Sequence, residues 1–382
     1  MAEENRKRQI QKEVVEPLRI IVASDMHYLS ERLYDGGEAF QKMMAEGDGK
    51  YTEGCQMIME AFVQNVCEEK PDAVLICGDL TFNGELLSLQ DMAAFCRRLK
   101  EACGKVFVIC GNHDIAYGMA AAYRQDQISA AANISAAEFM SLMAPYGYDE
   151  AFSRDAFSGS YAAVLRDDLW LLVLDANTTE QPGTIRPETL VWAEAVLKQA
   201  EKAAVRVISM SHQNVLKQNE MMYQGFVMNN HEEVEALLKK YHVFLNLSGH
   251  CHLQHVSVSG ELSDICTESL TIWPISCGYL LVDPARGTFT YESRSLNILQ
   301  EESRRRFDET LRRMVMPVLT GNGVPEEKQP AMIRFASEVS AQYFAGRNMN
   351  KEFYRNSPAW QDWHDWCGGS FWYFYLKLIL ES

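Results

Sequence analysis

Short apolar runs alternate with longer amphipathic stretches over the first three quarters of the chain. Runs rich in apolar and β-branched residues at 18–24, 73–77 and 105–110 have the length and composition of buried strands. Between them, residues 52–69 and 84–104 carry apolar side chains at helical spacing. This alternation of strand and helix predicts an α/β fold in which helices cover a sheet.

The alternation continues further along the chain, with two exceptions. Residues 28–51 are rich in glycine and charge and are expected to form an inserted loop, and the pattern weakens over 115–160. Elsewhere the predicted elements are paired strands at 161–165 and 169–175, a helix at 187–203, a strand at 205–211, a helix at 231–241 capped by Asn230, a strand at 243–248, and short strands to about residue 295.

The character of the sequence changes near residue 300. Residues 298–316 are charged and helical, and their arginine run at 304–306 is expected to form a solvated helix face. A linker rich in glycine, proline and charge follows at 320–330, before a second helix and an aromatic end. The predicted division is a polar N-terminal segment at 1–17, a main domain at 18–299 and a small helical domain at 300–382.

Composition narrows the class of protein. The 382 residues carry a formal net charge of −16, which disfavours a partner such as duplex nucleic acid that is held through its phosphates. The ten cysteines have neither metal-type nor disulfide spacing, which favours buried thiols in a reduced, cytoplasmic compartment. A cell-surface or secreted location is the alternative if a signal peptide has been removed. The longest apolar run, 371–380, is too short to form a transmembrane segment.

Five short polar motifs each follow the end of a predicted strand. Open α/β folds bind ligands at the carboxyl ends of their strands, so we expect these motifs to converge. Residues two apart in an extended segment point to the same side, which lets both polar residues of an Asp-x-His or His-x-His motif face one site. In chain order the motifs are Asp25-Met-His27, Gly78-Asp79, Gly111-Asn-His-Asp114, Ser211-His212 and Gly249-His-Cys-His252.

The chemistry of these residues indicates a metal site. Imidazole, carboxylate and amide oxygen are ligands that suit Zn, Mn or Fe. Two ions roughly 4 Å apart could share one carboxylate, hold a hydroxide and clamp phosphoryl oxygens for in-line displacement. Taken alone, Gly78-Asp79 is most often a plain turn and His212 a satisfied core histidine. The order of all five motifs and their placement at strand ends favour the metal site.

Together the motifs resemble the calcineurin-like metallophosphoesterase superfamily over roughly residues 18–290. The resemblance implies an α/β (α+β) fold, a four-layer sandwich of two β-sheets flanked by helices. It also implies that His113 is the general acid or transition-state stabiliser, oriented by Asp114. The residues implied to hold the two ions are Asp25, His27 and His252 for the first, Asn112, His212 and His250 for the second, and Asp79 between them.

A finer resemblance concerns the substrate. Residues 24–30, 35–40 and 78–85 look like a bacterial branch close to class III cyclic nucleotide phosphodiesterases, which also carries a small helical C-terminal domain. Phe82 stands where purple acid phosphatases have a tyrosine, so an iron-tyrosinate site is not expected. The leading hypothesis is hydrolysis of a small phosphodiester, with cyclic nucleotides as the best candidates, by attack of a metal-bridging hydroxide.

Other hypotheses stay open at this stage. The enzyme alternative is a phosphomonoesterase, including a Ser/Thr protein phosphatase. The alternative that is not an enzyme is a catalytically silent metal-binding or scaffold protein, although no ligand of the motif set is missing. The aromatic C-terminus also suggests an oligomerisation or surface-binding module. Metal identity and oligomeric state are not fixed by the sequence.

Overall fold

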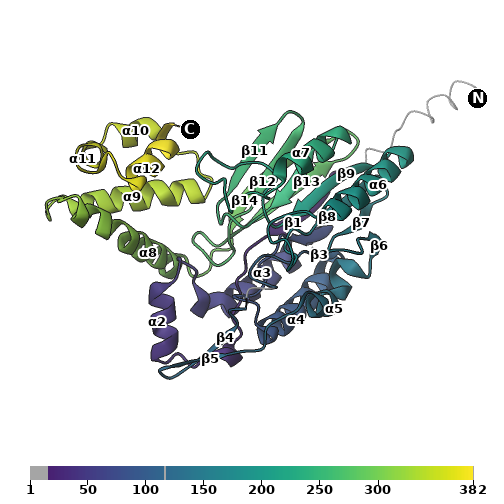
Figure 1. The fold of residues 1–382 in the computed structure, drawn as a ribbon, viewed down its shortest axis with the longest axis horizontal. Coiled ribbons are helices and arrows are strands. Elements are labelled where there is room, and N and C mark those ends of the chain that lie inside the picture. Colours follow the sequence, from purple (N-terminus) through teal and green to yellow (C-terminus); the bar gives the residue numbers. More distant parts are fainter. Residues whose placement is uncertain (1–15, 116–117, 382) are drawn as a thin grey trace, which may run out of the picture.

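Two β-sheets form the centre of the protein (Figure 1). The computed structural model describes residues 16–115 and 118–381, so the predicted polar segment at 1–17 lies outside the described residues except for its last two positions. The first sheet has the strand order β14 (Thr288–Ser295), β13 (Ser276–Asp283), β1 (Leu18–Ala23), β2 (Ala73–Ile76) and β3 (Val106–Val108). In this sheet β1, β2 and β3 run parallel, and β13 is antiparallel to both of its neighbours.

The second sheet is longer and also has a parallel centre. Its strands β8, β9, β10 and β12 run parallel, and antiparallel strands complete both edges. The order is β11 (His255–Ser259), β12 (Leu262–Cys266), β10 (Leu245–Ser248), β9 (Arg206–Ser211), β8 (Leu169–Leu174), β7 (Tyr161–Arg166) and β6 (Ala151–Arg154). The predicted pairing of 161–165 with 169–175 is confirmed by β7 and β8.

Alternate side chains of the second sheet point into two different cores, as the pleat of a strand requires. Leu171 and Val173 belong to the core that contains the first sheet and its helices. Leu172 and Leu174 pack on the other side, against the second pair of helices. This arrangement confirms the predicted sandwich of two sheets flanked by helices. The flanking helices are α3 (Cys55–Glu69) and α4 (Leu86–Cys103) on the first sheet, and α6 (Pro187–Ala203) and α7 (His231–Lys240) on the second.

The segment at 28–51 is not the irregular loop that the sequence predicted. It contains a short 3₁₀ turn, η1 (Glu31–Leu33), and a helix, α2 (Glu38–Glu46). Phe40 and Met44 of α2 are buried in a small apolar cluster with Leu29 and Tyr123. The flanking glycines and charges conceal a two-turn amphipathic pattern that tertiary packing makes into a helix.

The segment at 115–160, where the pattern weakens, also contains regular structure. Ser135 and Glu138 form a capping box at the start of α5, a helix-start signal that the sequence does carry. Asn230 stands at the predicted N-cap position of α7, but its side chain makes no capping bond to the helix backbone. It pairs with the backbone N–H and carbonyl of Ile185 and donates to the Glu233 side chain. The elements of this segment are β4 (Ala121–Arg124), β5 (Gln127–Ala130), α5 (Ala136–Leu142), the π-turn η3 (Ala144–Tyr148) and β6.

Five helices after β14 form a core of their own at one end of the molecule (Figure 1). Trp363 is fully buried at its centre, and its indole N–H donates to the carbonyl of Met332. Within the described residues, no helix is both long enough and apolar enough to cross a membrane. The division into two domains at residue 300 stays a prediction. The helices are α8 (Gln300–Gly321), α9 (Gln329–Phe344), α10 (Lys351–Arg355), α11 (Pro358–Cys367) and α12 (Phe371–Glu381).

The arginine run at 304–306 is not simply a solvated helix face, as the sequence suggested. The Arg304 guanidinium donates to Asp308 of α8 and to Glu338 of α9, and the second bond ties the two helices together. Arg306 reaches out of the helical core and donates to the carbonyl of Met44 at the end of α2. Two of the three arginines therefore connect elements.

Glu268 provides a test of the packing between the second sheet and β14. Its side chain is 2% exposed and accepts a hydrogen bond from Ser293, and burial raises the pKa of its carboxyl group to about 7. A carboxyl group whose pKa rises on folding loses stabilisation as it ionises, so stability falls as pH rises from about 4 through 7. Glu268→Gln is expected to raise the free energy of unfolding above wild type by on the order of 2 kcal/mol at about pH 8.5, and not at about pH 5.

Urea unfolding at the two pH values measures this difference. The matched control is Glu261→Gln, because the Glu261 side chain is 82% exposed and its charge is solvated in both states. An equal change at both pH values in Glu268→Gln would show that packing, and not ionisation, governs this site.

Candidate metal centre

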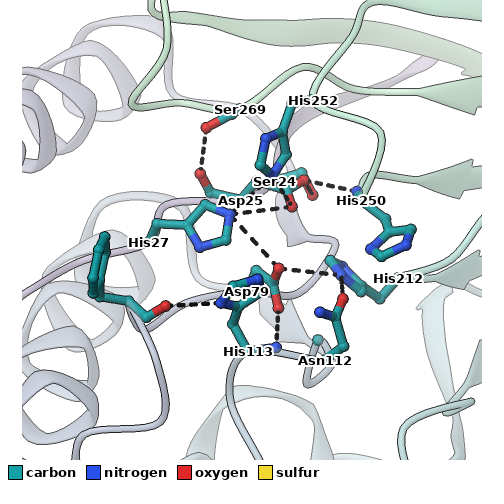
Figure 2. A network of polar contacts seen from close by, with 12 residues as sticks. Ser24, Asp25, His27, Asp79, Asn112, His113, His212, His250, His252 and Ser269 are labelled. Atoms are coloured by element: carbon teal, nitrogen blue, oxygen red, sulfur yellow. Dashed lines mark hydrogen bonds and ion pairs between the residues drawn. The ribbon is translucent and has the colours of Figure 1, made fainter. Parts of the chain in front are cut away.

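All seven predicted ligands lie at the carboxyl ends of strands, where the two sheets meet. β1, β2 and β3 belong to the first sheet, and β9 and β10 to the second. Figure 2 shows these side chains pointing toward one another. By strand, the residues are Asp25 and His27 after β1, Asp79 after β2, Asn112 after β3, His212 after β9, and His250 and His252 after β10.

Four of these residues surround one point. The ligand atoms of Asp25, His27, Asp79 and His252 all lie within 4.8 Å of one another. The His27 Nε2 is 3.7 Å from the Asp25 Oδ1 and 3.6 Å from the Asp79 Oδ2, and the His252 Nε2 is 3.3 Å from the Asp25 Oδ1. Two carboxylates and two imidazoles at this separation fit one metal ion of the Zn, Mn or Fe class.

Asp79 also faces a second group. Its Oδ2 is 3.4 Å from the Nε2 of His212, and that nitrogen is 2.9 Å from the Oδ1 of Asn112. The rings of His212 and His250 meet edge to face, with their centroids 5.0 Å apart. Asp79 therefore stands between the two predicted groups of three, as a bridging carboxylate would.

In two of the histidines, a hydrogen bond to a backbone carbonyl determines which ring nitrogen faces the predicted metal position. The His212 Nδ1 lies 2.8 Å from the carbonyl oxygen of Cys77, and the His250 Nε2 lies 2.7 Å from that of Gly225. A carbonyl can only accept, so each of these nitrogens carries a proton, and the other ring nitrogen is the one that a metal ion would bind. This carbonyl–histidine arrangement is typical of metal ligands.

The burial and the charge of the carboxylates also fit the binding of cations at this site. Asp25 and Asp79 are fully buried, and in the described residues neither the Asp25 Oδ1 nor the His27 Nδ1 has a hydrogen-bond partner. Burial works against ionisation of both Asp79 and His212. Their mutual attraction outweighs it, so the pKa of Asp79 lies well below its usual range and that of His212 rises to about 10. Both carboxylates therefore stay ionised, and a bound cation would compensate their charge.

The backbone reaches this geometry through left-handed turns, not through extended segments. Asp25, His27 and Asp79 have φ of 52°, 41° and 50°, and His250 and His252 have 67° and 53°. The expected reason for their shared direction, extended backbone, is therefore wrong, although each pair does face the site. Such conformations cost energy in residues other than glycine and persist only where the surrounding structure holds them.

The motif glycines allow the turns to approach closely. A Cβ at Gly111 would lie 2.1 Å from the Asp79 Oδ1, and one at Gly249 would lie 1.8 Å from the Ser24 Oγ and 2.4 Å from the Asp25 Oδ2. Ser24 itself donates to that Asp25 oxygen at 2.6 Å. These glycines are required because the carboxylates and the neighbouring turn occupy the same space.

His113 lies on the same face of the centre as His27, and the two rings meet edge to face at 4.8 Å. Its Nδ1 is 3.0 Å from the Phe82 carbonyl oxygen and 2.9 Å from the Asn83 Oδ1. The proton on Nδ1 therefore points at acceptors. The sequence analysis did not assign Phe82 or Asn83 to this task, although both lie in the segment that carried the resemblance.

Asp114 acts on the backbone around His113. It accepts hydrogen bonds from the N–H groups of Leu80, Thr81 and Gly111 and from the Thr81 hydroxyl. Burial and the neighbouring Asp79 charge raise the pKa of Asp114 to about 7, against these N–H donors. Asp114 therefore binds the two turns that carry Asp79 and His113, while Phe82 and Asn83 contact the His113 ring. Its role in orienting His113 stays a prediction.

Comparisons with known proteins agree with this geometry. The family described as calcineurin-like phosphoesterase matches residues 18–254, which include all five motifs. No curated protein matches the sequence significantly. Among solved structures, a dimetal phosphatase from Danio rerio aligns with a TM-score of 0.52 and 15% identity, covering 74% of this chain and 97% of that one. At this identity the likeness shows the fold alone.

Two further solved structures are more distant. A protein from Thermus thermophilus aligns with a TM-score of 0.41 and 16% identity, over 74% of this chain and 100% of that one. A purple acid phosphatase from yellow lupin seeds aligns with a TM-score of 0.48 and 15% identity, over 74% of this chain and 52% of that one. Both TM-scores are below 0.5, too low to support a conclusion about this chain.

Gly249→Ala tests the close approach of the turns. The added Cβ would displace Ser24 and the Asp25 carboxylate, so we expect the bound metal measured by plasma mass spectrometry to fall to half of the wild-type content or less. Gly321→Ala is the control, because no atom lies within 4 Å of its added Cβ and alanine is favoured at the helical position it occupies. Full metal content in Gly249→Ala would contradict the packing argument.

Proposed function

Because this chain belongs to the calcineurin-like phosphoesterase family, we propose that it is a two-metal hydrolase of phosphodiesters with cyclic nucleotides as its leading substrates. Family membership makes the protein a hydrolase acting on phosphoester bonds. The number of metal ions, the roles of single residues and the substrate belong to the proposal. The observation that carries it is the cluster of Asp25, His27, Asp79 and His252 around one point, with the Nε2 of His212 3.4 Å from the Asp79 Oδ2.

In this proposal the ligand residues divide as the resemblance implies. When bound, the two ions would activate water and neutralise charge on the phosphoryl group. Asp79 would contact both positions, since its Oδ2 lies within 3.6 Å of both the His27 and the His212 Nε2 atoms. The first ion would be held by Asp25, His27 and His252, and the second by Asn112, His212 and His250.

His113 would transfer a proton to the leaving oxygen. The Phe82 carbonyl and the Asn83 side chain hold the ring through Nδ1, and in this proposal Nε2 would exchange the proton with the leaving oxygen. The ring is partly buried beside His27, so its position is fixed before substrate binds. A positioned general acid of this kind contributes about 10²- to 10⁴-fold to turnover.

The preference for a diester over a monoester is part of this proposal. A monoester carries about two negative charges near neutral pH, and proteins often bind such groups with arginine forks. A diester carries one charge and has less need of such a fork. The choice of cyclic nucleotides rests on the resemblance of residues 24–30, 35–40 and 78–85.

His113→Ala tests the assigned proton transfer. Turnover of bis-p-nitrophenyl phosphate is expected to fall about 10²-fold or more, because the acid is lost. Metal content is expected to stay at the wild-type level, because His113 is not among the predicted ligands. The control is His242→Ala, whose side chain is 71% exposed beside Glu261. Wild-type turnover in His113→Ala would contradict the role given to this residue.

A substrate panel separates the remaining alternatives. Metal-loaded protein is assayed on bis-p-nitrophenyl phosphate, p-nitrophenyl phosphate and cyclic AMP, with Mn, Zn and Fe added in turn. A higher kcat/KM on the diesters supports the proposal, and a higher value on the monoester favours the phosphomonoesterase. Stoichiometric metal without turnover of any ester would leave the silent metal-binding protein.

A further inference from the structure

Lys50 is a buried lysine next to the metal centre. The residue is 8% exposed, although its ammonium group carries a charge that is costly to remove from water. Its Nζ donates to the Asp48 carboxylate at 2.8 Å, and the Asp48 side chain is itself 58% exposed. An ammonium group has three donors, and Asp48 accounts for one of them. Lys50 was predicted only as part of an inserted loop, without a role of its own.

Contacts through Phe82 locate the ammonium on the side of the centre that holds His113. The Lys50 Nζ lies 5.9 Å from the centroid of the Phe82 ring, and the backbone carbonyl of Phe82 contacts the His113 Nδ1. The His113 ring in turn meets the ring of His27, a predicted ligand of the first ion, with the two centroids 4.8 Å apart. The ammonium therefore lies on the side of the centre that holds the proposed acid.

Helix α8 holds the segment that delivers Lys50. The last turn of α2 leaves carbonyl oxygens without partners in the helix, and arginines of α8 satisfy them. Arg306 donates to the Met44 carbonyl at 3.0 Å, and Arg313 donates to the carbonyls of Ala45 and Gly47. These two arginines are seven residues apart and lie on one face of α8. We name residues 44–50 the delivery segment, because it leads from this contact to the centre.

We propose that Lys50 is a substrate-binding residue whose ammonium group contacts a non-bridging oxygen of the bound phosphoester, and that Arg306 and Arg313 position it through the delivery segment. The inference rests on the proposed phosphodiester hydrolysis and identifies a side chain that binds its anion. A lysine suits this task because it is a compact point charge that requires no forked geometry. The C-terminal helices then contribute to substrate binding without reaching the substrate themselves.

Lys50→Met tests the contact, because methionine keeps most of the apolar stem and removes the charge. The KM for bis-p-nitrophenyl phosphate is expected to rise about tenfold to a hundredfold, as loss of one charge-assisted hydrogen bond implies, with a smaller change in kcat. Lys50→Arg is expected to recover part of the loss. The matched control is Lys42→Met on α2, an exposed lysine in the same inserted segment.

Binding of inorganic phosphate gives a readout that does not depend on turnover. Calorimetric titration of the metal-loaded protein with inorganic phosphate is expected to show about tenfold weaker binding in Lys50→Met than in wild type. Metal content and thermal unfolding are measured on the same samples. Wild-type values for both show that the centre and the fold are intact, so that weaker binding reports the lost ammonium.

Arg313→Gln tests the positioning role. It is expected to raise the KM in the same direction as Lys50→Met, while Arg312→Gln, an exposed neighbour on α8, serves as the control. If Arg313 acts through Lys50, the double variant has the KM of Lys50→Met alone, because the two effects share one contact. Multiplicative effects in the double variant would overturn the positioning role.

The failures of the two proposals are distinguishable. Wild-type turnover with an unchanged KM and unchanged phosphate affinity in Lys50→Met overturns the role of Lys50 and leaves phosphodiester hydrolysis standing. Absence of turnover by metal-loaded wild type on every ester overturns the proposed function. In that case the phosphate titration decides whether Lys50 binds an anion at this centre.

Discussion

Two buried carboxylates, Asp25 and Asp79, impose the constraint on which the centre depends. Neither is exposed, and both face the Nε2 of His27 within 3.7 Å. Two buried anions at this separation are tolerated only if cations compensate them and hydrogen bonds fill their remaining acceptor positions. The Ser24 hydroxyl and the His250 N–H bind Asp25, and the His113 N–H binds Asp79. The turns that carry the ligands are thus built around the carboxylates, and metal binding completes the compensation.

The sequence predicted the fold wherever burial leaves a periodic pattern. The apolar run of β8 and the amphipathic spacing of α6 were located to within a residue or two, because a strand between two cores and a helix on a sheet need such patterns. The helix α2 was missed, since only Ala39, Phe40 and Met44 are buried and glycines flank it. Its conformation depends on contacts with β4 and with α8, which no local pattern reveals.

The candidate centre could be predicted as a set of residues but not as a geometry. Strand-end position and ligand chemistry were enough to select Asp79 and His212 from many polar residues. They could not show that five ligands have positive φ, that Gly111 is fixed by the volume of the Asp79 carboxylate, or that Asn83 holds the His113 ring. These features depend on distances between segments far apart in the sequence. The sequence shows the glycines of the motifs, but it does not show the steric reason why glycine is required at these positions.

The change of pattern near residue 300 is a boundary in the sequence, yet hydrogen bonds cross it on both sides of the centre. Arg306 and Arg313 hold the carbonyl end of α2, and on the other side the Tyr343 hydroxyl accepts from Asn219 at 2.6 Å. Asn219 lies in the same loop as Gly225, whose carbonyl sets the tautomer of His250. Loosening the C-terminal helices would therefore release both loops, one carrying Lys50 and one orienting a ligand. These bonds form only when both parts of the chain are folded. The stability of the site therefore depends on the C-terminal helices as well as on the segment that contains its motifs.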